Sequence, residues 1–302
     1  MKFIDLKDTR KIYKNKKNIT EWLKKKLRRT HNTSEIIEIA YDLQAGTYID
    51  IAKSNSFKNL KLYTKEMSKI LDGHIASNSS LLDVGTGELT TLTYLLNYMK
   101  KKPSNVFAFD LSWSRLIKGK KFFEKNIKNK KIPLSLFSAD IEFIPLHSNS
   151  IDVVISNHAL EPNGKKLTEL LSELFRVAKK KVILFEPSYE LNSIKGKQRM
   201  DRLGYIKNIS SAVKKLGGNL VDVFPTKYVD NPLNLTACYV IIPPTKQIKK
   251  TNIITYSTPG SDFSLKKELS FYVCKQSGLA YPIFKDIPIL KNNSSILVTA
   301  NY

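Results

Sequence analysis

The chain has 302 residues, of which 42% are apolar and 10% aromatic, so its composition supports a packed core and excludes a disordered protein. Its net charge of +23 favours anionic partners such as nucleic acid, an acidic membrane surface or phosphorylated substrates, but a solvated lysine-rich surface explains it equally well. No apolar run reaches the ~18 residues that span a bilayer, and no signal peptide is recognisable, so we expect a cytoplasmic protein.

Two cysteines, Cys238 and Cys274, form no C-x-x-C pair. This spacing predicts neither a disulfide framework nor a zinc site, and we expect no metal.

Residues 1–75 are predicted to form a helical extension. Apolar residues recur at helix spacing in two segments, around 19–27 and 57–74. The stretch YDLQAGTYIDIA, residues 41–52, lies between them, and its Gly46 indicates a break.

From residue 76 to 245 short apolar runs alternate with helical patterns. The runs are SLLDV, NVFAFD, PLSLFSAD, IDVVIS and KKVILFE, and helices are predicted over 88–100, 112–127 and 164–178. Each run is continuous rather than alternating, which is typical of strands buried on both faces. The order indicates an α/β fold with a mostly parallel sheet and helices on both faces. After Pro243-Pro244 and the basic stretch TKQIKK, residues 251–302 are predicted to form a small β-rich unit.

The stretch LLDVGTGELT, residues 81–90, predicts a tight turn between a strand and a helix. Asp83 is at the end of the strand, and Gly85 and Gly87 form the turn. Without Cβ atoms, the glycines permit positive φ angles and a close approach by a ligand. Ligands of open α/β sheets bind at this carboxyl edge.

Two more acids follow later strands. Asp110 ends NVFAFD, at the distance where a ribose-binding acid is expected, and Asp140 ends SLFSAD, next to Ile141. The first can accept from ribose hydroxyls, while Asp140 can accept from an exocyclic amine and Ile141 can cover a purine. No G-x-G-x-x-G occurs, because Leu89 and Thr90 stand near the place of a pyrophosphate-binding glycine. A nucleoside without a pyrophosphate is therefore favoured.

With these motifs, residues 80–242 resemble the class I S-adenosylmethionine-dependent methyltransferases, in particular the small-molecule branch (methyltransferase type 11-like). The segment FSADIEFIPLHSNSIDVVISNHAL carries the strongest part of the resemblance. It implies a Rossmann-like seven-stranded sheet with an antiparallel last strand and S-adenosyl-L-methionine as cofactor. The resemblance implies that Asp83, Gly85 and Gly87 surround its methionine part, Asp110 its ribose, and Asp140 with Ile141 its adenine.

Two tyrosines of the pre-turn segment, Tyr41 and Tyr48, resemble a lid that closes over the cofactor's sulfonium, or simply pack on the sheet edge. In SNHALEPNG, which follows the fourth strand, His158 is the candidate general base, and Glu161 either orients it or binds the substrate. A histidine at this place can also serve only to hydrogen-bond the sheet edge.

The tail, YVCKQSGLAYPIFKDIPIL, resembles the end of a Trm112-like module that has lost its zinc ligands; an unrelated β appendage is the alternative. We expect a methyltransferase that O-methylates an anionic small molecule or glycan precursor. An RNA methyltransferase is the second hypothesis, and a catalytically inactive binding protein with the same fold is the third. Nucleic acid is thus a possible partner that we do not favour, because few aromatics or arginines interleave with the lysines.

Overall fold

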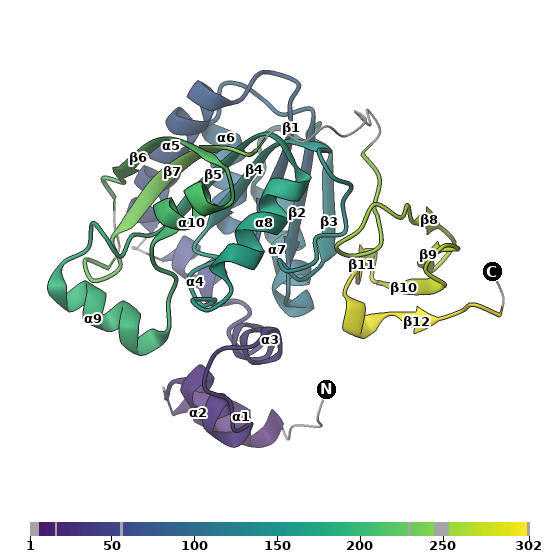
Figure 1. The fold of residues 1–302 in the computed structure, drawn as a ribbon, viewed down its shortest axis with the longest axis horizontal. Coiled ribbons are helices and arrows are strands. Elements are labelled where there is room, and N and C mark those ends of the chain that lie inside the picture. Colours follow the sequence, from purple (N-terminus) through teal and green to yellow (C-terminus); the bar gives the residue numbers. More distant parts are fainter. Residues whose placement is uncertain (1–5, 16, 55–56, 229–230, 245–253, 301–302) are drawn as a thin grey trace.

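A computed structural model describes residues 6–15, 17–54, 57–228, 231–244 and 254–300 (Figure 1). Its centre is a seven-stranded sheet with the order β3-β2-β1-β4-β5-β7-β6. The strands are β1 (Ser80–Val84), β2 (Asn105–Asp110), β3 (Leu134–Ser138), β4 (Ile151–Asn157), β5 (Ala178–Pro187), β6 (Asn219–Pro225) and β7 (Thr236–Ile242). Strands β1 to β5 run parallel, and β7 is antiparallel to both of its neighbours. The predicted fold class and its antiparallel last strand are therefore confirmed.

Apolar residues alternate between the two faces of each central strand, which explains the continuous runs in the sequence. In β1, for example, Leu82 packs into the core on one face and Leu81 into the core on the other. One face is covered by α5 (Phe57–His74), α6 (Thr90–Tyr98) and α7 (Trp113–Asn126). The other is covered by α8 (Leu167–Val177) and α10 (Ile209–Lys215). Both faces are buried, so neither has polar alternation.

The remaining helices lie outside these two layers. They are α1 (Leu6–Lys14), α2 (Ile19–Lys26), α3 (Ser34–Leu43), α4 (Thr47–Lys53) and α9 (Ile194–Leu203). Helices α2 and α3 share a small apolar core of their own, and Figure 1 shows them below the sheet. The break at Gly46 is confirmed, since this residue lies between α3 and α4 with a φ of 109°. Helix α9 was not predicted, because its apolar residues are too few to give a period.

The C-terminal unit is a small antiparallel sheet that docks against the edge strand β3. It contains β8 (Lys266–Lys267), β9 (Phe271–Cys274), β10 (Leu279–Phe284), β11 (Ile287–Pro288), β12 (Ile296–Leu297) and a 3-10 turn (Asn292–Ser294). Ile289 bridges Ser138 in parallel, and the Leu290 amide donates to the Ser138 carbonyl at 2.8 Å. This bridge joins the C-terminal unit to the end of β3.

The expected β-rich nature of the tail is confirmed, whereas its resemblance to a Trm112-like module and the domain boundaries stay predictions. The basic stretch 245–250 lies outside the described residues. No helix in the described ranges is long and apolar enough to cross a membrane.

Candidate active site

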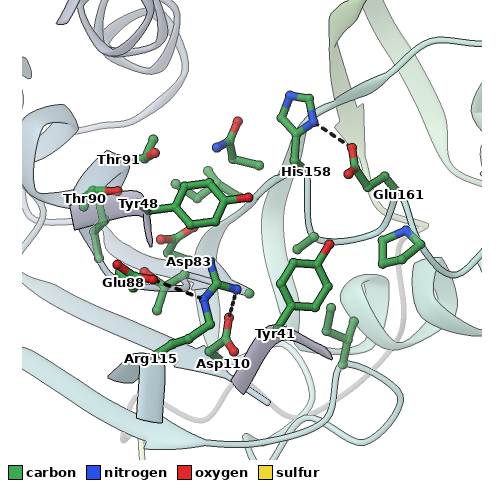
Figure 2. Close-up of a pocket in the computed structure, with 18 of the residues that line it drawn as sticks. Tyr41, Tyr48, Asp83, Glu88, Thr90, Thr91, Asp110, Arg115, His158 and Glu161 are labelled. Carbon is green, nitrogen blue, oxygen red and sulfur yellow. Dashed lines mark hydrogen bonds and ion pairs between the residues drawn. The ribbon is translucent and has the colours of Figure 1, made fainter. Parts of the chain in front are cut away.

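A cavity of about 350 Å³ opens at the carboxyl ends of the parallel strands, beneath α3 and α4 (Figure 2). Six of the seven predicted site residues line it: Asp83, Gly85, Asp110, Asp140, Ile141 and His158. The seventh, Gly87, lies behind the side chain of Arg115, whose guanidinium would be 2.3 Å from a Cβ at that position. The structure therefore brings together the residues that the sequence singled out.

The turn after β1 has the positive φ angles that its glycines predict. Gly85 has a φ of 68° and Gly87 a φ of 59°. A Cβ on Gly85 would lie 2.3 Å from the Ala159 Cβ, so the turn after β1 and the loop after β4 pack so closely that only glycine fits there. Leu89 also has a positive φ of 56° although it is fully buried, a strained conformation for a branched side chain.

Asp83 is 5% exposed at the base of the turn. Burial, and secondarily the charge of Asp110, raise its pKa to about 7. This carboxyl therefore titrates near neutral pH, where a nearby cation would favour its ionised form.

Asp110, the last residue of β2, is held by the glycine turn and by the start of α7. Its Oδ2 accepts from the Gly87 amide at 2.9 Å, and its Oδ1 accepts from the Ser112 amide at 2.8 Å. Arg115 Nη1 lies 3.4 Å from the same Oδ2. Asp110 thus binds the glycine turn directly, which the sequence did not predict.

Arg115 is the site residue that the sequence analysis missed. It lies in the first turn of α7, is 9% exposed, and points into the cavity (Figure 2). Its guanidinium carbon lies 5.1 Å from the ring centre of Tyr41 and 5.0 Å from that of Tyr48, a cation–π geometry. Burial lowers the pKa of Arg115, but the charge of Asp110 and its other neighbours outweighs burial and raises it. Arg115 therefore stays charged.

Glu88 fixes the lid segment to the glycine turn. Its two carboxylate oxygens accept from the amides of Gly46 at 2.8 Å and Ile49 at 2.9 Å, on either side of Tyr48. Its Oε1 also lies 4.0 Å from Arg115 Nε. Tyr41 and Tyr48 both line the cavity, with their rings facing an arginine of the same chain, and their role as a lid stays a prediction.

Asp140 lies two residues beyond the end of β3, so the expectation that it ends this strand was wrong. The strand stops at Ser138, although the Ala139 amide still donates to the Asp110 carbonyl at 3.2 Å, and a turn follows from residue 141. Asp140 Oδ1 accepts from the Glu142 amide at 3.1 Å, which stabilises that turn. Asp140 and Ile141 still line the cavity.

At the opposite end of the cavity, His158 contacts Glu161 and Thr236. Its Nδ1 lies 2.8 Å from Glu161 Oε2, and its Nε2 lies 2.8 Å from Thr236 Oγ1. Asn234 donates to the same Glu161 oxygen at 3.3 Å and accepts from Arg199 at 2.8 Å. The predicted partner of His158 is therefore confirmed as a contact. We call this group the His158 end, and Tyr41, Tyr48, Glu88, Asp110 and Arg115 the Arg115 end.

Glu186, at the end of β5, supports the His158 end from below. It is fully buried, and its Oε1 accepts from Ser156 at 2.6 Å and from the amides of Ala159 at 3.0 Å and Leu160 at 3.1 Å. Burial raises its pKa to about 7. Glu186 therefore holds the loop that carries His158.

A segment of the chain that contains most of this site matches a known family. Residues 82–185 match the family described as "Methyltransferase domain". The chain is an S-adenosylmethionine-dependent methyltransferase. The match begins in β1 and ends in β5, so it contains the glycine turn, Asp110 and His158, whereas the C-terminal unit lies outside it. No curated protein matches the chain.

Solved structures share the fold of this methyltransferase. The magnesium protoporphyrin IX methyltransferase of Synechocystis, solved with bound SAH, is 14% identical; the match covers 70% of this chain and 99% of that one, with a TM-score of 0.50. A SAM-dependent methyltransferase of Aquifex aeolicus is 19% identical, over 65% and 97% of the two chains, with a TM-score of 0.46. A structure titled as a complex of the Haloferax volcanii Trm112 methyltransferase activator and a putative methyltransferase is 15% identical, over 63% and 94%, with a TM-score of 0.48.

Proposed function

We propose that this methyltransferase methylates an oxygen atom of an anionic small molecule or glycan precursor, with His158 as general base. The observation that carries the proposal is the contact of both ring nitrogens of His158, with a carboxylate on one side and a hydroxyl on the other. S-adenosylmethionine, when bound, supplies an electrophilic methyl group, and the protein must position the acceptor and remove its proton.

The partners of His158 assign its two nitrogens. An ionised Glu161 only accepts hydrogen bonds, so His158 Nδ1 donates to it and Nε2 is left with a lone pair. That lone pair accepts from the Thr236 hydroxyl, 2.8 Å away. An acceptor hydroxyl in the place of Thr236 Oγ1 would give its proton to Nε2, while Glu161 stabilises the imidazolium.

Residues at the rest of the cavity fit the cofactor. Gly85 and Gly87 leave room beside the turn, and the Asp110 carboxylate faces the cavity with lone pairs still available on Oδ1. We propose that Asp110 binds the ribose, Asp140 and Ile141 the adenine, and the turn with Asp83 the methionine part.

The anionic nature of the acceptor is supported by charge near the His158 end. Arg199 bonds to Asn234 there, and α9 also carries Lys195, Lys197 and Arg202. A cationic helix beside the acceptor end attracts an anion and orients it.

RNA is the second candidate acceptor, favoured by the exposed lysines of the N-terminal helices. Lys25 and Lys26 are exposed on α2, and Lys26 lies 4.8 Å from the ring centre of Trp22. Such an aromatic–lysine pair is the element that single-stranded binding surfaces use.

The test is methyl transfer from labelled cofactor to pooled nucleotide sugars, other small phosphates and carboxylates, and pooled RNA. We expect label in the small-molecule pool, on a product with the stability of an ether or ester. Label in RNA alone, or on a nitrogen atom, would contradict the proposal. His158→Ala should lose this label, and Asp222→Ala, an exposed change on β6, is its control variant.

A further inference from the structure

The guanidinium of Arg115 occupies a space lined by two tyrosine rings and two carboxylates, which we call the box: Tyr41, Tyr48, Glu88 and Asp110. The rings of Tyr41 and Tyr48 lie about 5 Å from it, and Asp110 and Glu88 lie at 3.4 Å and 4.0 Å. Figure 2 shows Arg115 with these four side chains around it. The box holds a cation that belongs to the chain itself.

The same box has the groups that the proposed cofactor site needs. Tyrosine faces attract a sulfonium, the Asp110 carboxylate accepts from ribose hydroxyls, and the face of Gly87 admits a close ligand. Arg115 contacts all three of these groups. Its guanidinium lies against both tyrosine rings and pairs with Asp110 Oδ2, which also accepts from the Gly87 amide. Its Nη2 lies against Gly87.

The bonds of Arg115 are weak for so buried a cation. Its distance of 3.4 Å to Asp110 exceeds the ~2.7–2.9 Å of a good charge-assisted hydrogen bond. Among the described residues, its buried Nε has no hydrogen-bond partner. A side chain held mainly by ring faces and long ion pairs can leave at low cost compared with one in a bidentate pair.

We infer that Arg115 is an exchangeable internal cation, whose guanidinium occupies the sulfonium and ribose subsite and leaves it when S-adenosylmethionine binds. The inference rests on the proposed cofactor site. Arg115 then sets cofactor affinity, because binding is weakened by the fraction of molecules in which the box is filled.

The exchange lowers the affinity for the cofactor and for its product by the same factor, because the fraction of molecules in which the box is filled is a property of the free protein. With Arg115 displaced, Glu88 and Asp110 face a sulfonium in place of the guanidinium. S-adenosylhomocysteine has a neutral thioether at the same atom, so these acids favour the charged cofactor over the product.

The test compares wild type, Arg115→Gln and Arg10→Gln by calorimetry with both ligands. Arg10 is exposed on α1, so its variant removes the same charge away from the cavity. We expect Arg115→Gln to bind S-adenosylmethionine about tenfold more tightly, as for a box that is filled ~90% of the time, and to bind the product more tightly by a similar factor. Arg10→Gln should resemble wild type.

Weaker or unchanged binding by Arg115→Gln would overturn the exchange and make Arg115 a ligand or a structural residue. If wild type itself binds neither compound, the proposed cofactor site fails, and the exchange fails with it. The two failures are therefore distinguishable.

A measurement on the wild type covers the case in which Arg115→Gln does not fold. Between two tyrosine rings, the Arg115 side-chain protons should show upfield-shifted nuclear magnetic resonances, assigned by comparison with Arg115→Lys. Saturation with S-adenosylmethionine should move them towards ordinary arginine positions. Resonances that stay upfield-shifted in the complex would overturn the proposal.

Discussion

The Arg115 end and the His158 end of the cavity differ in how their polar groups are neutralised. At the Arg115 end, the guanidinium of Arg115 faces carboxylates and tyrosine rings, and this residue is 9% exposed. At the His158 end, Glu161, Asn234 and Thr236 form a chain of hydrogen bonds, and the His158 side chain is 31% exposed. The first end suits one fixed ligand that brings its own charge. The second suits an acceptor that exchanges hydrogen bonds.

His158→Ala should give the largest difference between the effects on turnover and on cofactor affinity. Loss of a general base should lower turnover roughly 10²-fold or more, with cofactor affinity nearly unchanged, because His158 belongs to the acceptor end. Turnover at saturating cofactor and calorimetry with S-adenosylmethionine measure the two quantities. Equal turnover in the variant would make His158 structural.

Asp110→Ala should mainly lower cofactor affinity, in contrast to His158→Ala. Losing charge-assisted ribose contacts should cost ~1.5–3 kcal/mol, which is about ten- to a hundredfold in cofactor affinity. Asp222→Ala, with an exposed carboxyl on β6, is the matched control. Unchanged calorimetric affinity in a folded Asp110 variant would remove this residue from the site.

Glu88→Gln tests the attachment of the lid. One carboxylate oxygen becomes an amide donor that faces the amide of Gly46 or Ile49, so one lid bond is lost. We expect cofactor affinity to fall roughly fivefold, for a loss of ~1 kcal/mol, with turnover at saturation preserved. Glu124→Gln, on the exposed side of α7, should have no effect.

Glu186→Gln should change the pH dependence of stability. The folded pKa of Glu186, about 7, lies above its ordinary value of 4.5, so between these values the folded state binds more protons than the unfolded state. Its contribution to stability is therefore lost as pH rises from about 4.5 to 7. Thermal unfolding from pH 5 to 8 should show a flatter profile in the variant, by on the order of 2 kcal/mol. An identical profile would contradict the raised pKa.

The smallest effect is expected from changing Lys24, Lys25 and Lys26 to Gln. If the acceptor is a small anion, these lysines are remote from both ends, and transfer should change less than twofold. RNA as acceptor would instead give a log–log salt slope of about −0.7 per phosphate contact, reduced in the variant. Tight RNA retention by wild type, lost together with methyl transfer, would overturn the small-molecule proposal.

These contrasts also show which parts of the site a sequence predicts. The acids and glycines at strand ends were predictable, because the topology of a parallel sheet brings strand ends to one edge. The partner of His158 lies three residues away on the same loop, so local spacing gave it. Thr236 and Asn234 were not predictable, since they come from β7 and the loop before it, nearly 80 residues further along the chain.

Arg115 escaped sequence analysis for a different reason. Within α7 it occupies a helix position like any other, and its environment comes from residues far along the chain: Tyr41, Tyr48 and Glu88. The sequence shows a leucine, Leu89, near a position where a glycine is expected. The space for its side chain in this strained conformation depends on Gly119, where a Cβ would lie 2.5 Å from the leucine side chain. Such compensation between α6 and α7 leaves no local pattern.

The pairing of Ile289 and Leu290 with Ser138 has a consequence for solubility. Strand β3 is the outer strand of a sheet with apolar faces, and an uncovered strand of this kind invites pairing with another molecule. The C-terminal unit occupies this edge and buries Leu290 and Tyr281 beside it. A chain shortened before residue 254 would expose the edge together with the apolar surface that this unit covers. The tail thus protects the sheet from aggregation, whatever else it binds.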